Sequence, residues 1–189
     1  MSISKIFAVL YWVWIASEVL LQLVTRTSRS QGQLKDRGSL WLLLTAIFAS
    51  VWAAFYYSDT HPPTMFGGAH WLRWVALVLM LAGFAIRWTA ILSLGSTFST
   101  NVAIHSAHTL RTTGIFRWVR HPSYSGMLLN FLAVGIYQRN WISLAIVLLF
   151  PIAALIYRIH VEESALLEAF GAQYAAYSNA TRRLVPGIY

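Results

Sequence analysis

Long apolar runs alternate along the chain with short segments that carry most of its charged residues. The runs cover Ile6–Val24, Leu40–Tyr57, Trp71–Leu94, Tyr124–Tyr137 and Trp141–Tyr157. A helix that crosses the hydrocarbon core of a bilayer needs about 20 mostly apolar residues. Tyr124–Tyr137 has 14 residues, so it crosses the membrane only if its helix extends into 138–140. The pattern predicts an all-α, polytopic membrane protein with about five transmembrane helices and a single domain over residues 1–189.

The second half of the chain differs in organisation from the first. Residues 1–94 are expected to form three spans, whereas residues 95–189 begin with a long connection, 95–123, that contains His105, His108 and Gly114. The last two runs predict a tight helical hairpin with its turn at 138–140, and Pro151 should kink the second helix of that hairpin. The apolar spacing after it predicts an amphipathic helix over Val161–Ser178 that lies on the membrane surface.

Basic residues predict the orientation of these helices. They gather in the first and third connections and after the last run, whereas the opposite side carries Lys5 and Arg139. Cytoplasmic loops of membrane proteins are enriched in Lys and Arg, so the N-terminus is expected outside and the C-terminus in the cytosol. Five spans require the same inversion. One Lys before the first run and four basic residues after it also favour a retained span over a cleaved signal peptide.

The composition supports a membrane protein and excludes several other classes. Hydrophobic residues make up 58% of the chain and charged residues 11%, whereas a soluble domain carries about 25% charged residues. There is no Cys, so a thiolate nucleophile and a Cys-ligated metal are excluded. The net charge of +8 is explained by basic cytoplasmic loops, and the chain has no basic run of five residues, so nucleic-acid binding is not expected.

Two charges lie deep inside apolar runs and need an explanation. Glu18 is six residues from Val24 and Arg87 is seven residues from Leu94, both counted toward the inner face. Their similar depth predicts an ion pair between the first and third helices. Alternatively, Arg87 extends its side chain to the inner headgroups, as long basic side chains near a membrane boundary often do.

Two polar clusters bracket the hairpin and suggest a functional site. The first is the stretch 120–126, Arg-His-Pro-Ser-Tyr-Ser-Gly, and the second comprises Arg158, His160, Glu162 and Glu163. Both belong at the same membrane face, because they begin and end one hairpin. Arg158 and Glu162 are four residues apart, which allows an ordinary salt bridge, although Glu before Arg would be the better order. Concentrated acidic residues at this boundary favour a cationic ligand instead.

A metal site is not expected from the histidines. His105 and His108 are three residues apart, whereas two His ligands on one helix usually lie four apart, and no carboxylate stands beside them.

The polar motifs resemble the isoprenylcysteine carboxyl methyltransferase family. The resemblance covers roughly residues 95–189. Its motifs are His108-Thr109-Leu110, Thr113-Gly114, the stretch 120–126, Glu162-Glu163 and Phe170-Gly171-x-x-Tyr174-x-x-Tyr177. The His-Pro-x-Tyr element is shared with phospholipid N-methyltransferases and sterol reductases. The spacing from Arg158 to Glu162 to Phe170 favours the carboxyl methyltransferases.

The resemblance implies S-adenosylmethionine as cofactor and Arg158 as the catalytic residue that faces the acceptor. Phe116 stands where the family often has Tyr, and Asn101 is a weak candidate for one further contact. The residues implied to bind the cofactor are His108, Thr109, Leu110, Arg111, Phe116, His121, Pro122, Ser123, Tyr124 and Glu162. The implied partners are membrane lipid and a lipophilic or prenylated acceptor. The compact arrangement of five spans resembles that of prokaryotic members of the family. This implies that the protein lies in a prokaryotic inner membrane, or in the endoplasmic reticulum if its source is a eukaryote.

Three other functions stay open at this point. A phospholipid-headgroup N-methyltransferase would need Glu162 or Glu163 as a base, and Arg158 would repel its ammonium acceptor. An NADPH-dependent, sterol-reductase-like oxidoreductase would need a basic cluster for the 2′-phosphate. In a non-catalytic membrane subunit, the His-Pro-Ser-Tyr run would only begin a helix, where Pro is common.

Overall fold

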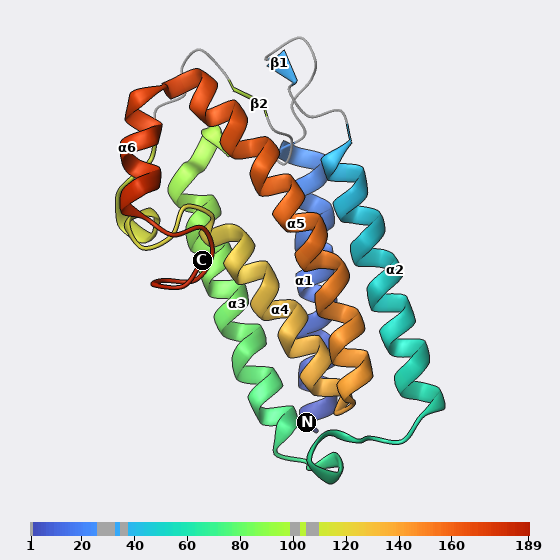
Figure 1. Cartoon of the computed structure of the whole chain (residues 1–189). Helices are drawn as coiled ribbons and strands as arrows, with labels where there is room; N and C mark the ends of the chain where they lie inside the picture. Colours follow the sequence, from blue (N-terminus) through green and yellow to red (C-terminus); the bar gives the residue numbers. More distant parts are fainter. Residues whose placement is uncertain (1, 26–32, 35–37, 99–102, 105–109) are drawn as a thin grey trace.

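The fold is a bundle of long helices that run side by side (Figure 1). The computed structural model describes residues 2–25, 33–34, 38–98, 103–104 and 110–189. The helices are α1 (Ile3–Thr25), α2 (Ser39–Thr60), α3 (Leu72–Leu94), α4 (Pro122–Gln138), α5 (Trp141–Phe170) and α6 (Ala172–Ala180). Short 3-10 helices are η1 (Met65–Gly68), η2 (Gly95–Thr97) and η3 (Gly114–Arg117). The strands β1 (Gln33–Leu34) and β2 (Ala103–Ile104) form one antiparallel pair.

The apolar runs become membrane-length helices, as predicted. Within the described part of the chain, four helices are long and apolar enough to cross a membrane, namely α1, α2, α3 and α5. The predicted fourth span is α4, which has 17 residues. The all-α membrane fold is thereby confirmed, whereas the number of spans and their orientation stay predictions.

The hairpin turn is where the sequence places it. Arg139 ends α4 in the left-handed region, with φ 57°. Asn140 then caps α5, because its side-chain oxygen accepts hydrogen bonds from the backbone N–H groups of Ile142 (2.9 Å) and Ser143 (3.3 Å). Such caps satisfy amide groups that the first helical turn leaves without partners. The turn between the end of α4 and the start of α5 therefore has a defined backbone geometry.

The predicted surface helix over Val161–Ser178 is wrong in its bounds. α5 continues without interruption from Trp141 to Phe170, through Pro151. The break falls at Gly171, where φ is 50°, and α6 follows. Nothing between Tyr157 and Phe170 breaks a helix, whereas Gly adopts a positive φ at little cost. The second polar cluster consequently lies on the last turns of the hairpin helix itself.

Close packing of α3 against α4 fixes the start of α4 in the bundle. A Cβ atom on Gly126 would lie 2.6 Å from the Gly83 carbonyl oxygen and 2.7 Å from the Arg87 backbone nitrogen. Real Cβ contacts are not that short, so only glycine allows this approach. This gives a packing reason for the glycine that ends the stretch 120–126.

The pair between Glu18 and Arg87 is confirmed, and the alternative that Arg87 reaches the headgroups is wrong. Nε and an Nη of Arg87 contact the two Glu18 carboxylate oxygens, and Trp14 Nε1 donates to Glu18 at 3.2 Å. Another Arg87 nitrogen donates to the Ser123 hydroxyl at 2.7 Å and to its carbonyl at 3.2 Å. Because Arg87 is only 3% exposed, it connects α1 to the first turn of α4 through the interior.

We expect Glu18→Gln to destabilise the protein by about 3–5 kcal/mol, since it leaves a buried guanidinium without its carboxylate. The measurement is the midpoint of thermal unfolding in detergent. Lys5→Gln, which removes an exposed charge from the same helix, serves as the control. Equal midpoints for Glu18→Gln and the wild type would contradict a structural role for the pair.

Candidate active site

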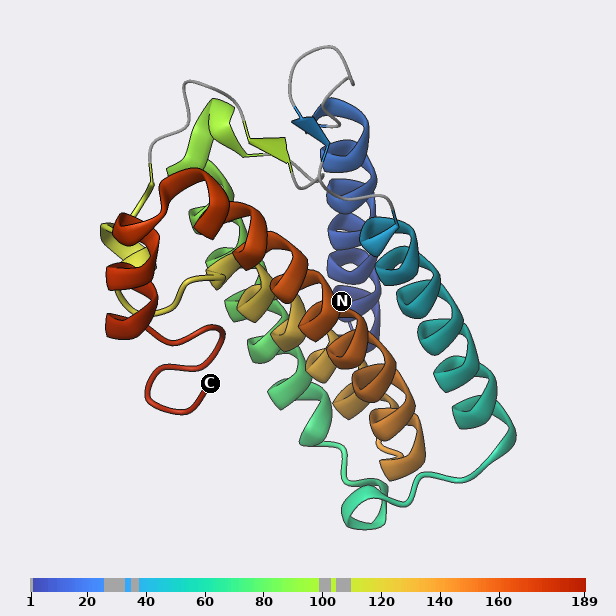
Figure 2. The same cartoon turned by 45° about the horizontal axis from the view of Figure 1, so that its top comes forward.

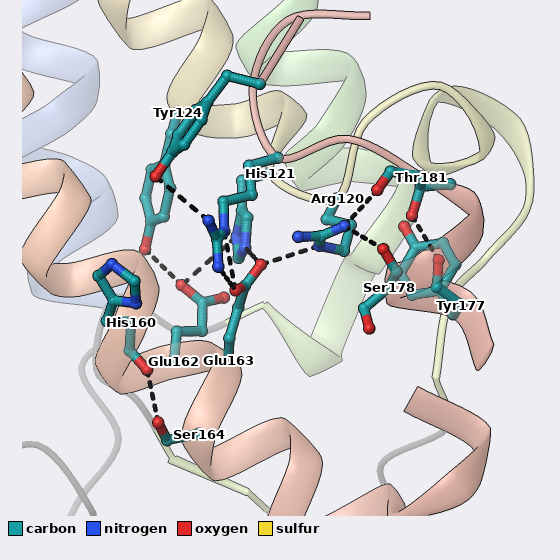
Figure 3. Close-up of polar contacts among 12 residues, drawn as sticks. Arg120, His121, Tyr124, His160, Glu162, Glu163, Ser164, Tyr177, Ser178 and Thr181 are labelled. Carbon is teal, nitrogen blue, oxygen red and sulfur yellow. Dashed lines mark hydrogen bonds and ion pairs between the residues drawn. The ribbon is translucent and has the colours of Figure 1, made fainter. Parts of the chain in front are cut away.

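Three segments that are distant in sequence meet at one polar cluster (Figure 3). The start of α4 supplies His121 and Tyr124, and the last turns of α5 supply Glu162 and Glu163. The third segment, Thr181–Leu184, follows α6 and is called the C-terminal segment below. Figure 2 shows α6 and the end of the chain on the side of α3 and α5, away from α2.

Tyr124 links the two charged residues that the sequence places on one face of α5. Its hydroxyl donates to Glu162 Oε2 at 2.7 Å and accepts from Arg158 Nε at 2.9 Å. Arg158 is 3% exposed and also donates to the Ser39 hydroxyl at 3.1 Å. Arg158 and Glu162 are thus connected through a half-buried tyrosine of α4, which is a different arrangement from an ordinary surface salt bridge.

Glu163 binds cationic or polar groups from two other segments. It accepts from Arg120 Nε at 2.8 Å, and its Oε1 lies 3.3 Å from His121 Nε2. Arg183 Nε and a second Arg183 nitrogen approach the other oxygen at 2.9 Å. The Glu163 side chain is 13% exposed. A half-buried carboxylate with several charge-assisted partners fixes their relative positions more firmly than an exposed pair does.

The C-terminal segment runs beside the start of α4. The backbone N–H groups of Arg120 and His121 donate to the carbonyls of Arg182 (2.7 Å) and Arg183 (2.9 Å). The Ser125 hydroxyl donates to the Leu184 carbonyl at 2.6 Å. The Arg120 side chain also donates to carbonyls at the end of α6 and in the C-terminal segment, those of Ser178 and Thr181 (Figure 3).

Aromatic faces and a carboxylate oxygen lie together in this cluster. The rings of His121 and Tyr124 are stacked, with centroids 5.5 Å apart and planes inclined by 12°. His121 Nδ1 lies 3.8 Å from Glu162 Oε2. Among the residues that the structure describes, none donates to Glu162 Oε1, and the Glu162 side chain is 31% exposed. This oxygen can therefore accept a hydrogen bond from a ligand.

Ionisable groups on α6 and in the C-terminal segment keep their protons. Burial raises the pKa of the Tyr174 hydroxyl, and the charge of Glu163 raises it further. Burial also raises the pKa of Tyr177. Hydrogen bonding to Glu163 raises the pKa of the Arg183 guanidinium. Both tyrosines therefore remain hydrogen-bond donors at neutral pH, and Arg183 remains a cation.

The structure brings four of the predicted site residues together, namely His121, Tyr124, Arg158 and Glu162. Pro122 is buried at the first position of α4.

The other predicted residues lie away from the cluster or outside the residues that the structure describes. Ser123 faces Arg87 of α3, and Phe116 is buried in η3, where its carbonyl accepts from the Tyr177 hydroxyl at 2.7 Å. Before η3, Leu110 is half-buried and Arg111 is exposed. The predicted positions outside the described residues are Asn101, His105, His108 and Thr109.

The sequence places Glu163 and Arg120 in the two polar clusters, and it names Glu163 as a base only for the N-methyltransferase alternative. It assigns neither residue, nor Arg183, to contacts with the cofactor or the acceptor. Arg183 and Ser39 carry no comparable signal, because their contacts join residues that are 20 and 119 positions apart.

The fold and cluster define a helical membrane protein with a polar site at one end of its bundle, and comparison with known proteins gives its family. The model of the isoprenylcysteine carboxyl methyltransferase family matches residues 74–168. The chain belongs to this family. A protein-S-isoprenylcysteine O-methyltransferase from Tribolium castaneum is 33% identical over 146 residues, which are 76% of this chain and 52% of the relative. A protein of the same name from Xenopus laevis is 30% identical over 141 residues, or 74% and 49%.

A solved structure has the same arrangement of helices. It is described as the eukaryotic intramembrane Ras methyltransferase, isoprenylcysteine carboxyl methyltransferase, without a monobody. The TM-score is 0.63 at 32% identity, and the match covers 77% of this chain and 52% of that one. The chain thus spans about half the length of the relatives it matches.

We expect Glu163→Gln to loosen the C-terminal segment, because Arg120 and Arg183 would lose their shared carboxylate. Hydrogen bonds to charged groups contribute about 1.5–3 kcal/mol each, so trypsin should cleave after Arg182 and Arg183 roughly tenfold faster or more. Glu168→Gln removes the same charge from an exposed position of the same helix and is the control. Equal cleavage rates in both variants would exclude this role of Glu163.

Proposed function

We propose that the protein is an S-adenosylmethionine-dependent methyltransferase that methylates a carboxylate on a lipid-embedded acceptor, such as a prenylcysteine or a related isoprenoid. The observation that carries the proposal is the connection from Arg158 through Tyr124 to Glu162. It places a cation and an anion at opposite sides of one buried hydroxyl. Such a site can hold a carboxylate beside a cationic donor. The family match supports methyl transfer as the reaction.

The donor set in the cluster fits S-adenosylmethionine. When bound, this cofactor supplies an electrophilic methyl group on a sulfonium sulfur. Glu162 Oε1 suits a cationic or hydroxyl group of the cofactor, and the stacked faces of His121 and Tyr124 suit a sulfonium and a flat adenine. The remaining residues that the family resemblance implies, His108 to Arg111 and Phe116, would complete the pocket.

Arg158 would orient the acceptor. Its guanidinium has a planar fork that can hold both oxygens of a carboxylate, and the neutral Ser39 hydroxyl is a partner that a carboxylate could replace. A carboxylate is ionised at neutral pH, so the enzyme needs no general base. Its task is to align the oxygen with the methyl group and to exclude water. Alignment can contribute about 7–11 kcal/mol, and burial of Arg158 limits access of water.

The alternatives fit this geometry less well. The ammonium acceptor of an N-methyltransferase would sit beside the buried guanidinium of Arg158, which disfavours it electrostatically. The match to a methyltransferase family model speaks against an NADPH-dependent reductase and a non-catalytic subunit. We place the site at the cytosolic face of a prokaryotic inner membrane, or of the endoplasmic reticulum in a eukaryotic source, as the distribution of basic residues predicts.

We expect the purified protein in detergent to transfer a labelled methyl group from S-adenosylmethionine to N-acetyl-farnesylcysteine. The product should be a methyl ester, which base hydrolyses to labelled methanol. Arg158→Gln should lower the rate by roughly 10²-fold, since misplacing one reactant by about 1 Å has a comparable effect. Arg158→Lys should recover little, because Lys keeps the charge but loses the fork.

Arg117→Gln removes an exposed arginine outside the cluster and should leave the rate unchanged. A base-stable product on a lipid amine, with full activity of Arg158→Gln, would favour the N-methyltransferase instead.

A further inference from the structure

A cavity lies next to the proposed methyl-transfer site, between the last turns of α5, α6 and the end of the chain. Its volume is about 530 Å³. The residues that line it include Arg120, Glu163, Tyr174, Arg182, Arg183 and Ile188, whereas Tyr124, Arg158 and Glu162 do not line it. The cavity is thus separate from the residues proposed to bind the donor and acceptor, although Glu163 forms part of the wall between them.

The charge of this cavity is positive. Three arginines line it, and they face a single glutamate. Glu163 already accepts from Arg120 and Arg183, so its charge is largely offset by these two. The Arg182 side chain is exposed and forms no hydrogen bond or ion pair with any residue that the structure describes. Its guanidinium can therefore bind an anion.

A buried hydroxyl in the wall also lacks a partner. Tyr174 is 3% exposed, and its hydroxyl has no hydrogen-bond partner within the described residues. Glu163 raises the pKa of this hydroxyl by its charge and as a nearby hydrogen-bond acceptor, although the contact does not meet full hydrogen-bond geometry. A buried hydroxyl that makes no hydrogen bond costs about 1–3 kcal/mol. An acceptor oxygen that entered the cavity would remove this cost.

Exposed apolar side chains line part of the cavity, beside the exposed polar residues His160, Ser164 and Asn179. Leu167 is 50% exposed, Ile188 is 80% exposed and Tyr189 is 36% exposed, and all three line the cavity. Exposed apolar side chains beside a cationic interior match an amphipathic molecule with an anionic head. In a protein with membrane-length helices, such molecules are phospholipids.

We propose that this cavity binds a phosphate group, held by Arg182, Arg183 and the Tyr174 hydroxyl. Arginine suits phosphate because its planar fork can donate two parallel hydrogen bonds. The source is either the headgroup of an anionic phospholipid, with its chains along Leu167 and Ile188, or free phosphate. The site does not depend on the proposed methyl transfer, because none of these residues is assigned to that reaction.

The test is a binding titration of the delipidated full-length protein in detergent, followed by native mass spectrometry. The probes are a short-chain phosphatidylglycerol and inorganic phosphate. Loss of one charge-assisted contact corresponds to about a tenfold weaker affinity, and loss of one neutral hydrogen bond to about a threefold to fivefold weaker one. We therefore expect about tenfold weaker binding for Arg182→Gln and threefold to fivefold weaker binding for Tyr174→Phe.

Arg117→Gln, an exposed arginine that does not line the cavity, is the matched control and should bind like the wild type. Tyr174→Phe removes a single oxygen, so its fold can be verified by an unchanged unfolding midpoint. Binding of phosphatidylglycerol alone, with this dependence on the variants, identifies a lipid headgroup site, and binding of both probes identifies a general phosphate site. If neither probe binds, or if Arg182→Gln and Tyr174→Phe bind both probes like the wild type, the proposal is wrong.

Discussion

The carboxylate of Glu163 joins α5 to two other segments of the chain. Arg120 and His121 lie where the long connection enters α4, and Arg183 belongs to the C-terminal segment. Because the C-terminal segment also accepts backbone hydrogen bonds from Arg120 and His121, the start of α4 is fixed from two sides. The positions of the His121 and Tyr124 rings depend on this arrangement, and with them the shape of the proposed donor site.

A second constraint acts from inside the bundle. Arg87 connects Glu18 of α1 to Ser123, one residue before Tyr124, in a region where an unpaired charge would be costly. Gly83 and Gly126 allow α3 and α4 to approach closely at the same level. Ion pair, close packing and the Glu163 contacts therefore converge on a single helical turn. Tyr124 can then connect Arg158 with Glu162 in a defined geometry, which is the kind of preorganised site that methyl transfer between two bound molecules requires.

Much of the fold could be predicted from the sequence because the bilayer imposes a length on each apolar run. The similar depth of Glu18 and Arg87 indicated their pair but left open the alternative that Arg87 reaches the headgroups. The position of two polar clusters around one hairpin predicted that they lie at the same face. The end of α5 was misplaced by 13 residues, from Tyr157 to Phe170, because charges on a helical face do not end a helix, whereas Gly171 does. Tyr124 links Arg158 to Glu162, and Arg183 and Ser39 make their contacts, only because distant segments pack together. Such packing leaves no periodic pattern in the sequence from which it could be predicted.

The central claim is that the stacked rings and the carboxylate of Glu162 hold a cationic methyl donor. Calorimetric titration of the protein in detergent with S-adenosylmethionine tests it most directly. We expect one saturable site, with affinity about tenfold lower or more in Glu162→Gln, since a charge-assisted hydrogen bond is lost, and unchanged in Glu168→Gln. No binding by the wild type, or equal binding by both variants, would contradict the account.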